Sequence, residues 1–165
     1  MAGSKRIVLA AGLVGLVIGM TGCGLVKDDN VHNVQTMSEA DVTRRVEQYA
    51  EQVAALVGGE LVNPAVNSAP CEGRAGEMDE QIRYVQGTYQ IPLAAEKHIE
   101  TLARLREEWR AKGWTITEDR TFPSGTEGAL AATTKEDGYS ISLTSTTPPN
   151  AVALLIHSTC YRSAD

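Results

Sequence analysis

The segment "GALAATTKEDGYSISLTST", residues 128–146, decides the fold. Two strand-like arms flank the central residues Lys135-Glu136-Asp137-Gly138. An Asp-Gly pair between two such arms is a strong signal for a β-hairpin. In the second arm, large apolar residues alternate with serine and threonine, so one face should be buried and the other should meet water. The inward residues would be Tyr139, Ile141 and Leu143.

Three further segments extend the predicted sheet. Residues 82–93, "IRYVQGTYQIPL", alternate apolar and polar side chains and predict a strand that ends at Pro92. Residues 114–120 offer a short strand. Residues 151–159, "AVALLIHST", are apolar on both parities for most of their length, which is typical of a strand in the middle of a sheet.

Two helices are expected before and between these strands. Residues 38–59 repeat apolar side chains at helical spacing, with Ser38 and Asp41 placed to cap the start and two glycines at the end. Residues 94–113 form the second helix, which stops at Gly113. Its buried stripe would be Ala95, Ile99, Leu102, Leu105 or Arg106, and Trp109.

The order of these elements is α-β-α-β-β-β, which favours an α+β fold. We expect an antiparallel sheet of four to five strands with two helices packed on one face, in a single domain over residues 38–165. The stretch 60–81 contains two prolines and Cys71 and is expected to be a long connecting loop. The outward face of the predicted sheet is rich in serine, threonine and glutamine. This face could receive a partner or a glycan, or it could simply be solvated.

The first 22 residues have the composition of a secretory signal peptide. Lys5 and Arg6 precede 14 apolar or glycine residues, and Thr21-Gly22 follow before Cys23. The apolar run is shorter than the roughly 20 residues that a membrane-spanning helix needs. Residues 1–22 are therefore expected to be a leader rather than a membrane span.

Met20-Thr21-Gly22-Cys23 resembles the lipobox of bacterial lipoproteins. The resemblance implies that the Cys23 thiol receives a diacylglyceryl group and becomes the mature N-terminus. Two acyl chains hold a protein stably at a membrane, whereas one does not. Residues 23–37 would then be a flexible tether, and the protein would be anchored at the extracytoplasmic face of the cell membrane.

The whole plan also resembles small envelope lipoproteins of actinobacteria, which combine a lipobox, one compact α+β domain, one cysteine pair and an ending like Cys160-Tyr161-Arg162. This resemblance carries no catalytic residue over. If Cys23 is lipidated, two of the three cysteines remain, and Cys71 can pair with Cys160. Such a bridge would contribute about 4–5 kcal/mol in the chain-entropy picture. A redox pair or a metal site at these cysteines is the alternative.

Charge and motifs exclude several functions. The full chain has a net charge of −6, and loss of Lys5 and Arg6 with the leader makes it −8, which disfavours nucleic-acid binding. The chain has no G-x-S-x-G nucleophile motif, no phosphate loop and no dinucleotide fingerprint. We therefore expect no cofactor.

The histidines and acidic residues also suggest no site. His157 and Ser158 are adjacent on a predicted strand and should point to opposite faces, so His157 is interpreted as structural. His98 is expected near the exposed edge of its helix, and His32 lies in the tether. No metal-ligand spacing is present. An acidic group is interpreted as a solvated loop: Glu72, Glu77, Asp79 and Glu80.

Three functional hypotheses follow. The first is a membrane-anchored, non-enzymatic envelope protein that binds a partner protein or acts as an accessory factor, and it is favoured because no catalytic motif is present. The second is a carrier of a small or lipidic ligand, which needs a cavity between helices and sheet. That cavity would be lined by Val46, Tyr49, Ile99, Leu102 and Leu143. The third is a hydrolase whose polar groups converge from distant segments.

Overall fold

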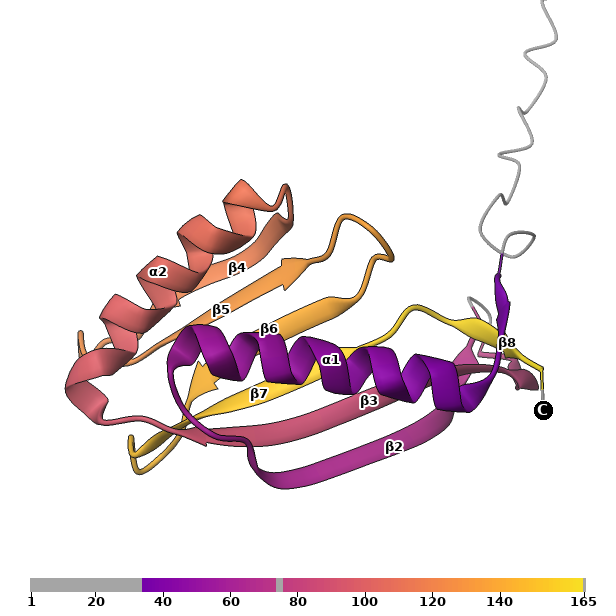
Figure 1. Ribbon diagram of the computed structural model, residues 1–165, viewed down its shortest axis with the longest axis horizontal. Helices are drawn as coiled ribbons and strands as arrows, with labels where there is room; N and C mark the ends of the chain where they lie inside the picture. The colour runs from indigo at the N-terminus through magenta and orange to yellow at the C-terminus, as the bar shows by residue number, and fades with distance from the viewer. Residues whose placement is uncertain (1–33, 74–75, 165) are drawn as a thin grey trace, which may run out of the picture.

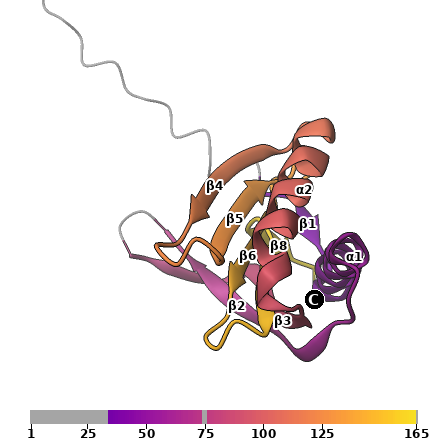
Figure 2. The same cartoon turned by 90° about the vertical axis from the view of Figure 1, so that its left-hand side faces the viewer.

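The protein is an α+β structure with two helices and a mostly antiparallel sheet of eight strands (Figure 1). The computed structural model describes residues 34–73 and 76–164. Figure 2 shows both helices on the same side of the curved sheet. In chain order the elements are β1 (Thr36–Met37), α1 (Glu39–Val57), β2 (Val62–Glu72), β3 (Met78–Pro92), a 3₁₀ turn η1 (Ala95–Lys97), α2 (His98–Ala111), β4 (Thr115–Thr121), β5 (Gly128–Thr133), β6 (Ser140–Ser145), β7 (Ala151–His157) and β8 (Tyr161–Ser163).

Strand β3 organises the sheet. One of its edges pairs antiparallel with β2, and its other edge pairs with the short β8 at Ile82–Arg83 and then with β7 from Gln86 to Pro92. From β7 the sheet continues through β6 and β5 to β4, all antiparallel, while β1 adds to β8 in parallel. The predicted central position of the 151–159 strand is confirmed, since β7 lies between β3 and β6.

The sheet has eight strands rather than the expected four to five, and the order of the elements differs from the expected α-β-α-β-β-β. The stretch 60–81 is not a loop, because most of it forms β2 and the start of β3. Pro64 and Pro70 suggested a loop, but among the described strands β2 pairs with β3 alone, and prolines are tolerated in edge strands of this kind. The ladder is also irregular beside both prolines, between Val62 and Ala65 and between Pro70 and Cys71.

The hairpin over residues 128–146 is confirmed. Strands β5 and β6 pair from Ala129↔Thr144 to Thr133↔Ser140, and Gly138 in the turn has φ +72°, a conformation that glycine adopts readily. The three residues predicted to face inward are all buried, whereas Ser140 and Thr144 are exposed. The alternation therefore reports the buried face correctly.

Helix α1 begins as predicted. The Ser38 hydroxyl accepts a hydrogen bond from the Asp41 amide at 3.1 Å and donates one to the Asp41 carboxylate at 2.8 Å. The buried stripe of α1 packs on β3 and β7 and comes very close to the sheet at Gly87, where a Cβ atom would lie 2.6 Å from Val46 Cγ1. Glycine at this position therefore lets the helix approach the strand. The stripe comprises Val42, Val46, Tyr49, Ala50, Val53, Ala54 and Val57.

Helix α2 packs on β4 and β5. It starts at His98 after the 3₁₀ turn, four residues later than the predicted start, and it ends close to Gly113. Leu102, Leu105 and Trp109 are buried as expected, whereas Ala95 and Ile99 are half-buried. Within residues 34–73 and 76–164, neither helix has the length and apolar character needed to span a bilayer.

Candidate functional site

A cleft of about 450 Å³ opens at the end of the molecule where β1 and β8 lie. The turn between β5 and β6 lies on one side of this end, and the first half of α1 lies on another side (Figure 1). Segments far apart in the chain therefore meet here. The lining residues are Gln35, Met37, Arg45, Glu136, Asp137, Tyr139, Thr159, Cys160 and Tyr161.

Asp137 joins the hairpin turn to helix α1 at the wall of this cleft. Its carboxylate accepts hydrogen bonds from Arg45 Nη1 at 3.1 Å, from the Tyr49 hydroxyl at 2.9 Å and from the Thr134 hydroxyl at 2.6 Å. The Thr134 oxygen in turn accepts the Tyr139 amide at 2.8 Å. A single carboxylate thus fixes the turn against the helix, so this wall is rigid.

Tyr139 and Tyr161 line the cleft, and the Tyr49 ring packs against Tyr139 behind it. Burial, with a further contribution from the nearby Asp137 carboxylate, raises the pKa of Tyr139 to about 12. Burial and the Asp137 hydrogen bond raise the pKa of Tyr49 to about 12 as well. Tyr161 is only 2% exposed, and its hydroxyl has no hydrogen-bond partner among the described residues. The Tyr49 and Tyr139 phenols are therefore neutral at physiological pH, and the Tyr161 hydroxyl is a polar atom buried within the protein.

The rim of the cleft is polar and accessible. The Arg45 side chain is 49% exposed, and within the described residues its guanidinium contacts Asp137 alone. Gln35, Glu136 and Thr159 are exposed beside it. The rim therefore presents a guanidinium, a carboxylate, an amide and a hydroxyl to solvent.

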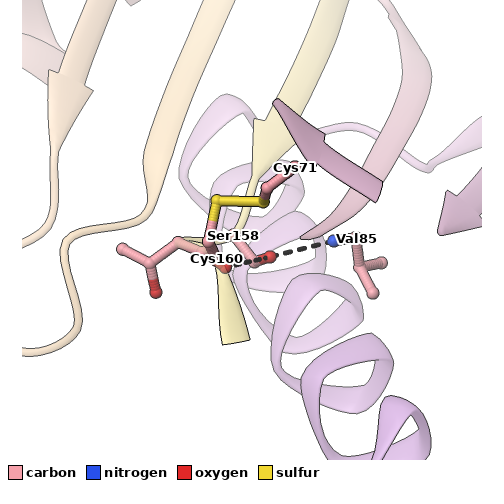
Figure 3. The surroundings of a disulfide bond; sticks show 5 residues. Cys71, Val85, Ser158 and Cys160 are labelled. Carbon is pink, nitrogen blue, oxygen red and sulfur yellow. Dashed lines mark hydrogen bonds between the residues drawn. A yellow bond between two sulfur atoms is a disulfide. The ribbon is translucent and has the colours of Figure 1, made fainter. Parts of the chain in front are cut away.

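A disulfide between Cys71 and Cys160 braces the same end, which confirms the expected pairing (Figure 3). Its Cα atoms are 6.3 Å apart, and it joins the tip of β2 to the segment that leads into β8. Next to it, the Ser158 hydroxyl accepts the Val85 amide at 2.9 Å and donates to the Thr159 carbonyl at 2.8 Å. Cys160 therefore lies in a cleft wall that is fixed both covalently and by hydrogen bonds.

The start of β1 is also tied to this end. The Arg162 amide donates to the Gln35 carbonyl at 2.8 Å, and the Ala164 amide donates to the Met37 carbonyl at 3.1 Å. The flexible tether expected over residues 23–37 therefore does not extend to its last residues, because Thr36 and Met37 form a strand. Cys23 and His32 lie outside the described residues.

His98 was predicted to lie at an exposed helix edge, and that prediction is wrong. The side chain is 0% exposed; Nδ1 lies 2.9 Å from the Ser145 hydroxyl and Nε2 lies 3.1 Å from the Leu93 carbonyl. The Ser145 oxygen also accepts the Gly128 amide at 3.0 Å. A serine–histidine pair is the core of many nucleophilic sites, but here Ser145 is 7% exposed and its oxygen is fully engaged. The pair fastens the start of α2 to the sheet.

The remaining sequence candidates lie apart from one another. His157 stacks on Tyr84 with ring centroids 4.9 Å apart, and burial lowers its pKa, while Ser158 is buried beside the disulfide. Glu72, Glu77, Asp79 and Glu80 are exposed around the tip of the β2–β3 hairpin. Within the described part of the chain, no group of three or more His, Cys, Asp or Glu side chains is arranged to hold a metal ion.

The side chains that were expected to line a ligand-carrying cavity are packed against other side chains instead. Val46, Tyr49, Leu102 and Leu143 belong to the hydrophobic core, and Ile99 is half-buried. The cleft described above is lined by different residues and lies at the end of the sheet rather than beneath the helices.

Comparison with known proteins does not assign the chain to a group. No protein-family model matches it. No curated protein matches it at a significant level either.

Proposed function

We propose that this protein is an exported lipoprotein, anchored through a diacylglyceryl group on Cys23, whose folded domain binds a partner in the cell envelope. The observation that carries the anchoring is the use of the cysteines. Cys71 and Cys160 are joined to each other, so the third cysteine of the chain, Cys23, has no intramolecular partner left. Cys23 directly follows an apolar leader in a lipobox-like sequence. Its thiol is therefore free to receive the diacylglyceryl group.

The position of β1 is consistent with such an anchor. Residues 24–35 separate Cys23 from β1. A flexible chain of twelve residues spans on average about 20 Å. The β1–β8 end, with its cleft, would therefore be held close to the outer surface of the membrane.

Two observations favour a binding role. The polar groups that could act in catalysis hold the fold together, and the apolar side chains that could carry a ligand are packed in the core. The serine–histidine pair is buried and engaged in holding α2, and His157 contacts an aromatic ring rather than a nucleophile. The side chains beneath the helices are packed in the core, which leaves the accessible polar cleft as the place for a partner.

Mass spectrometry of the protein purified from native envelopes tests the anchor. We expect a chain that begins at Cys23 and carries the added mass of a diacylglyceryl group. In a Cys23→Ser variant this addition should be lost, and the protein should leave the membrane fraction. The double variant Cys71→Ser, Cys160→Ser is the matched control and should stay lipidated. A bare Cys23 thiol in the native protein would overturn the proposal.

Crosslinking in intact envelopes tests the binding role. A photo-crosslinker placed at Thr159 on the exposed rim should capture one predominant partner. The same probe at Arg110, an exposed residue of α2 that does not line the cleft, is the control. Equal capture at both positions would contradict a binding surface at the cleft.

A further inference from the structure

We propose that the cleft between β1, β8 and the β5–β6 turn is a binding site for a neutral, hydroxyl-rich ligand of the size of one or two sugar rings. The inference concerns the cleft itself and does not depend on the lipid anchor. It follows from the charge balance, the mixture of donors and acceptors, and the rigidity of the walls.

The charges of the cleft disfavour a charged ligand of either sign. Arg45 and Asp137 form an ion pair at 3.1 Å, and the Glu136 carboxylate lies beside them on the rim. An anion that approaches the guanidinium meets two carboxylates, while a cation that approaches the carboxylates meets the guanidinium. In both cases the ligand is brought close to a like charge, which weakens the binding of charged ligands.

A hydroxyl group suits this arrangement because it donates and accepts at once. Carboxylates only accept hydrogen bonds and a guanidinium only donates them, whereas a hydroxyl can serve both. The amide of Gln35 and the hydroxyl of Thr159 add groups of both kinds to the rim. A ring that carries several hydroxyls can therefore satisfy the whole rim, which a ligand with a single polar group cannot.

The floor and the size of the cleft fit the same class. Met37 is half-buried and supplies apolar surface between the polar groups, while Tyr139 and Tyr161 are almost fully buried beneath it. The C–H face of a sugar ring can cover the exposed part of Met37. The volume of about 450 Å³ lies within the range of about 300–1,000 Å³ that is usual for small-ligand sites.

The walls of the cleft are held in place by contacts within the protein itself. Asp137 is fixed by three hydrogen bonds, and Cys160, which also lines the cleft, is fixed by the disulfide. A site that does not have to be ordered on binding loses less affinity to conformational entropy.

Nuclear magnetic resonance titration of the full chain in detergent micelles tests the proposal. The probes are methyl glucoside and N,N′-diacetylchitobiose as neutral sugars, glucosamine as a cation and glucuronate as an anion. We expect the neutral sugars to shift the backbone signals of Asp137, Thr159 and Tyr161 saturably, and the charged sugars to bind about tenfold more weakly. The proposal is overturned if these signals are shifted neither by a neutral soluble probe at about 50 mM, far above the Kd of a millimolar complex, nor by the glycolipid of the nanodisc experiment below. It is also overturned if a charged probe binds more tightly.

Two rim variants locate the binding. Arg45→Gln and Glu136→Gln should each weaken neutral sugar binding about tenfold, the expected result of losing one charge-assisted hydrogen bond. Arg110→Gln on α2 is the control for removal of an exposed arginine and should bind as the wild type does. Circular dichroism verifies that the variants are folded. Unchanged affinity in both rim variants would overturn the assignment to this cleft.

The sugar could come from a free envelope glycan or from a glycolipid headgroup. The full chain in phosphatidylcholine nanodiscs, with and without digalactosyl diacylglycerol, separates the two sources. Shifts at the cleft that require the glycolipid identify a headgroup, and shifts with soluble sugar alone identify a free glycan. Absence of both contradicts the proposal, and it does so without affecting the lipidation of Cys23, which mass spectrometry measures separately.

Discussion

The helix-covered middle of the sheet and its β1–β8 end are stabilised in different ways. Beneath the helices, the structure depends on buried apolar side chains such as Leu105, Trp109 and Leu143, each 0% exposed. At the β1–β8 end, it depends on one disulfide and on the hydrogen bonds of Asp137. Burial closes the middle completely, whereas a few specific links hold the end together and leave a cleft accessible.

The largest expected effect is loss of the disulfide. Cys71 and Cys160 are 89 positions apart, so the double variant Cys71→Ser, Cys160→Ser releases a long loop in the unfolded chain. We expect the free energy of unfolding to fall by about 4 kcal/mol. Urea unfolding followed by circular dichroism measures it. A double variant as stable as the wild type would show that hydrogen bonds alone hold this end.

Truncation of the apolar middle should have the next largest effect. Leu143→Ala removes a fully buried side chain between β5 and β7, and such a change costs about 3 kcal/mol. Its neighbour Ser142 lies on the opposite face of β6, and Ser142→Ala should change the unfolding free energy by less than about 0.5 kcal/mol. Similar urea midpoints for the two variants would contradict the orientation of this strand.

Asp137→Asn tests the polar end directly. The substitution removes the charge that pairs with Arg45 and disturbs the hydrogen bonds of Tyr49 and Thr134. We expect a loss of about 2 kcal/mol in the unfolding free energy, typical of a disturbed partly buried network. The adjacent exposed Glu136→Gln should have almost no effect on stability. If both variants are equally stable, the Asp137 contacts contribute little.

The smallest expected effect is a loss of stability at alkaline pH. The pKa values of Tyr49 and Tyr139 are raised from 10.0 to about 12 in the folded protein. The unfolded chain therefore releases these protons first, and stability should fall as the pH rises from about 10 toward 12. Each tyrosine should account for about 1 kcal/mol at pH 11. Urea unfolding at several pH values should show a shallower decline for Tyr139→Phe, and an unchanged decline would contradict the assignment.

The parts of the fold that could be predicted from sequence are those governed by local periodicity. Short patterns of consecutive residues predict three of these parts: the hairpin over residues 128–146, the Ser38 cap and the central strand at 151–159. Strand β2 could not be recognised in this way, because its two prolines match a loop as well as an edge strand. Its identity depends on pairing with β3, which no local pattern reports.

Most of the candidate site could not be predicted from the sequence either, because its contacts join residues that are far apart in the chain. Asp137 was recognised only as a turn residue, yet its side chain reaches Tyr49, 88 positions earlier. His98 was misplaced because its partner Ser145 lies 47 positions away. Only the cysteine pair could be anticipated at this end, and that inference depended on the lipobox resemblance rather than on geometry.

The pairing of β1 with β8 brings the last residues of the chain beside the first residues of the domain. An affinity tag or fluorophore fused to the C-terminus would therefore sit next to the cleft and, if the anchor is present, close to the lipid. The turn between β6 and β7, around Asn150, lies at the other end of the sheet (Figure 1). Labels intended to leave the cleft unobstructed belong there.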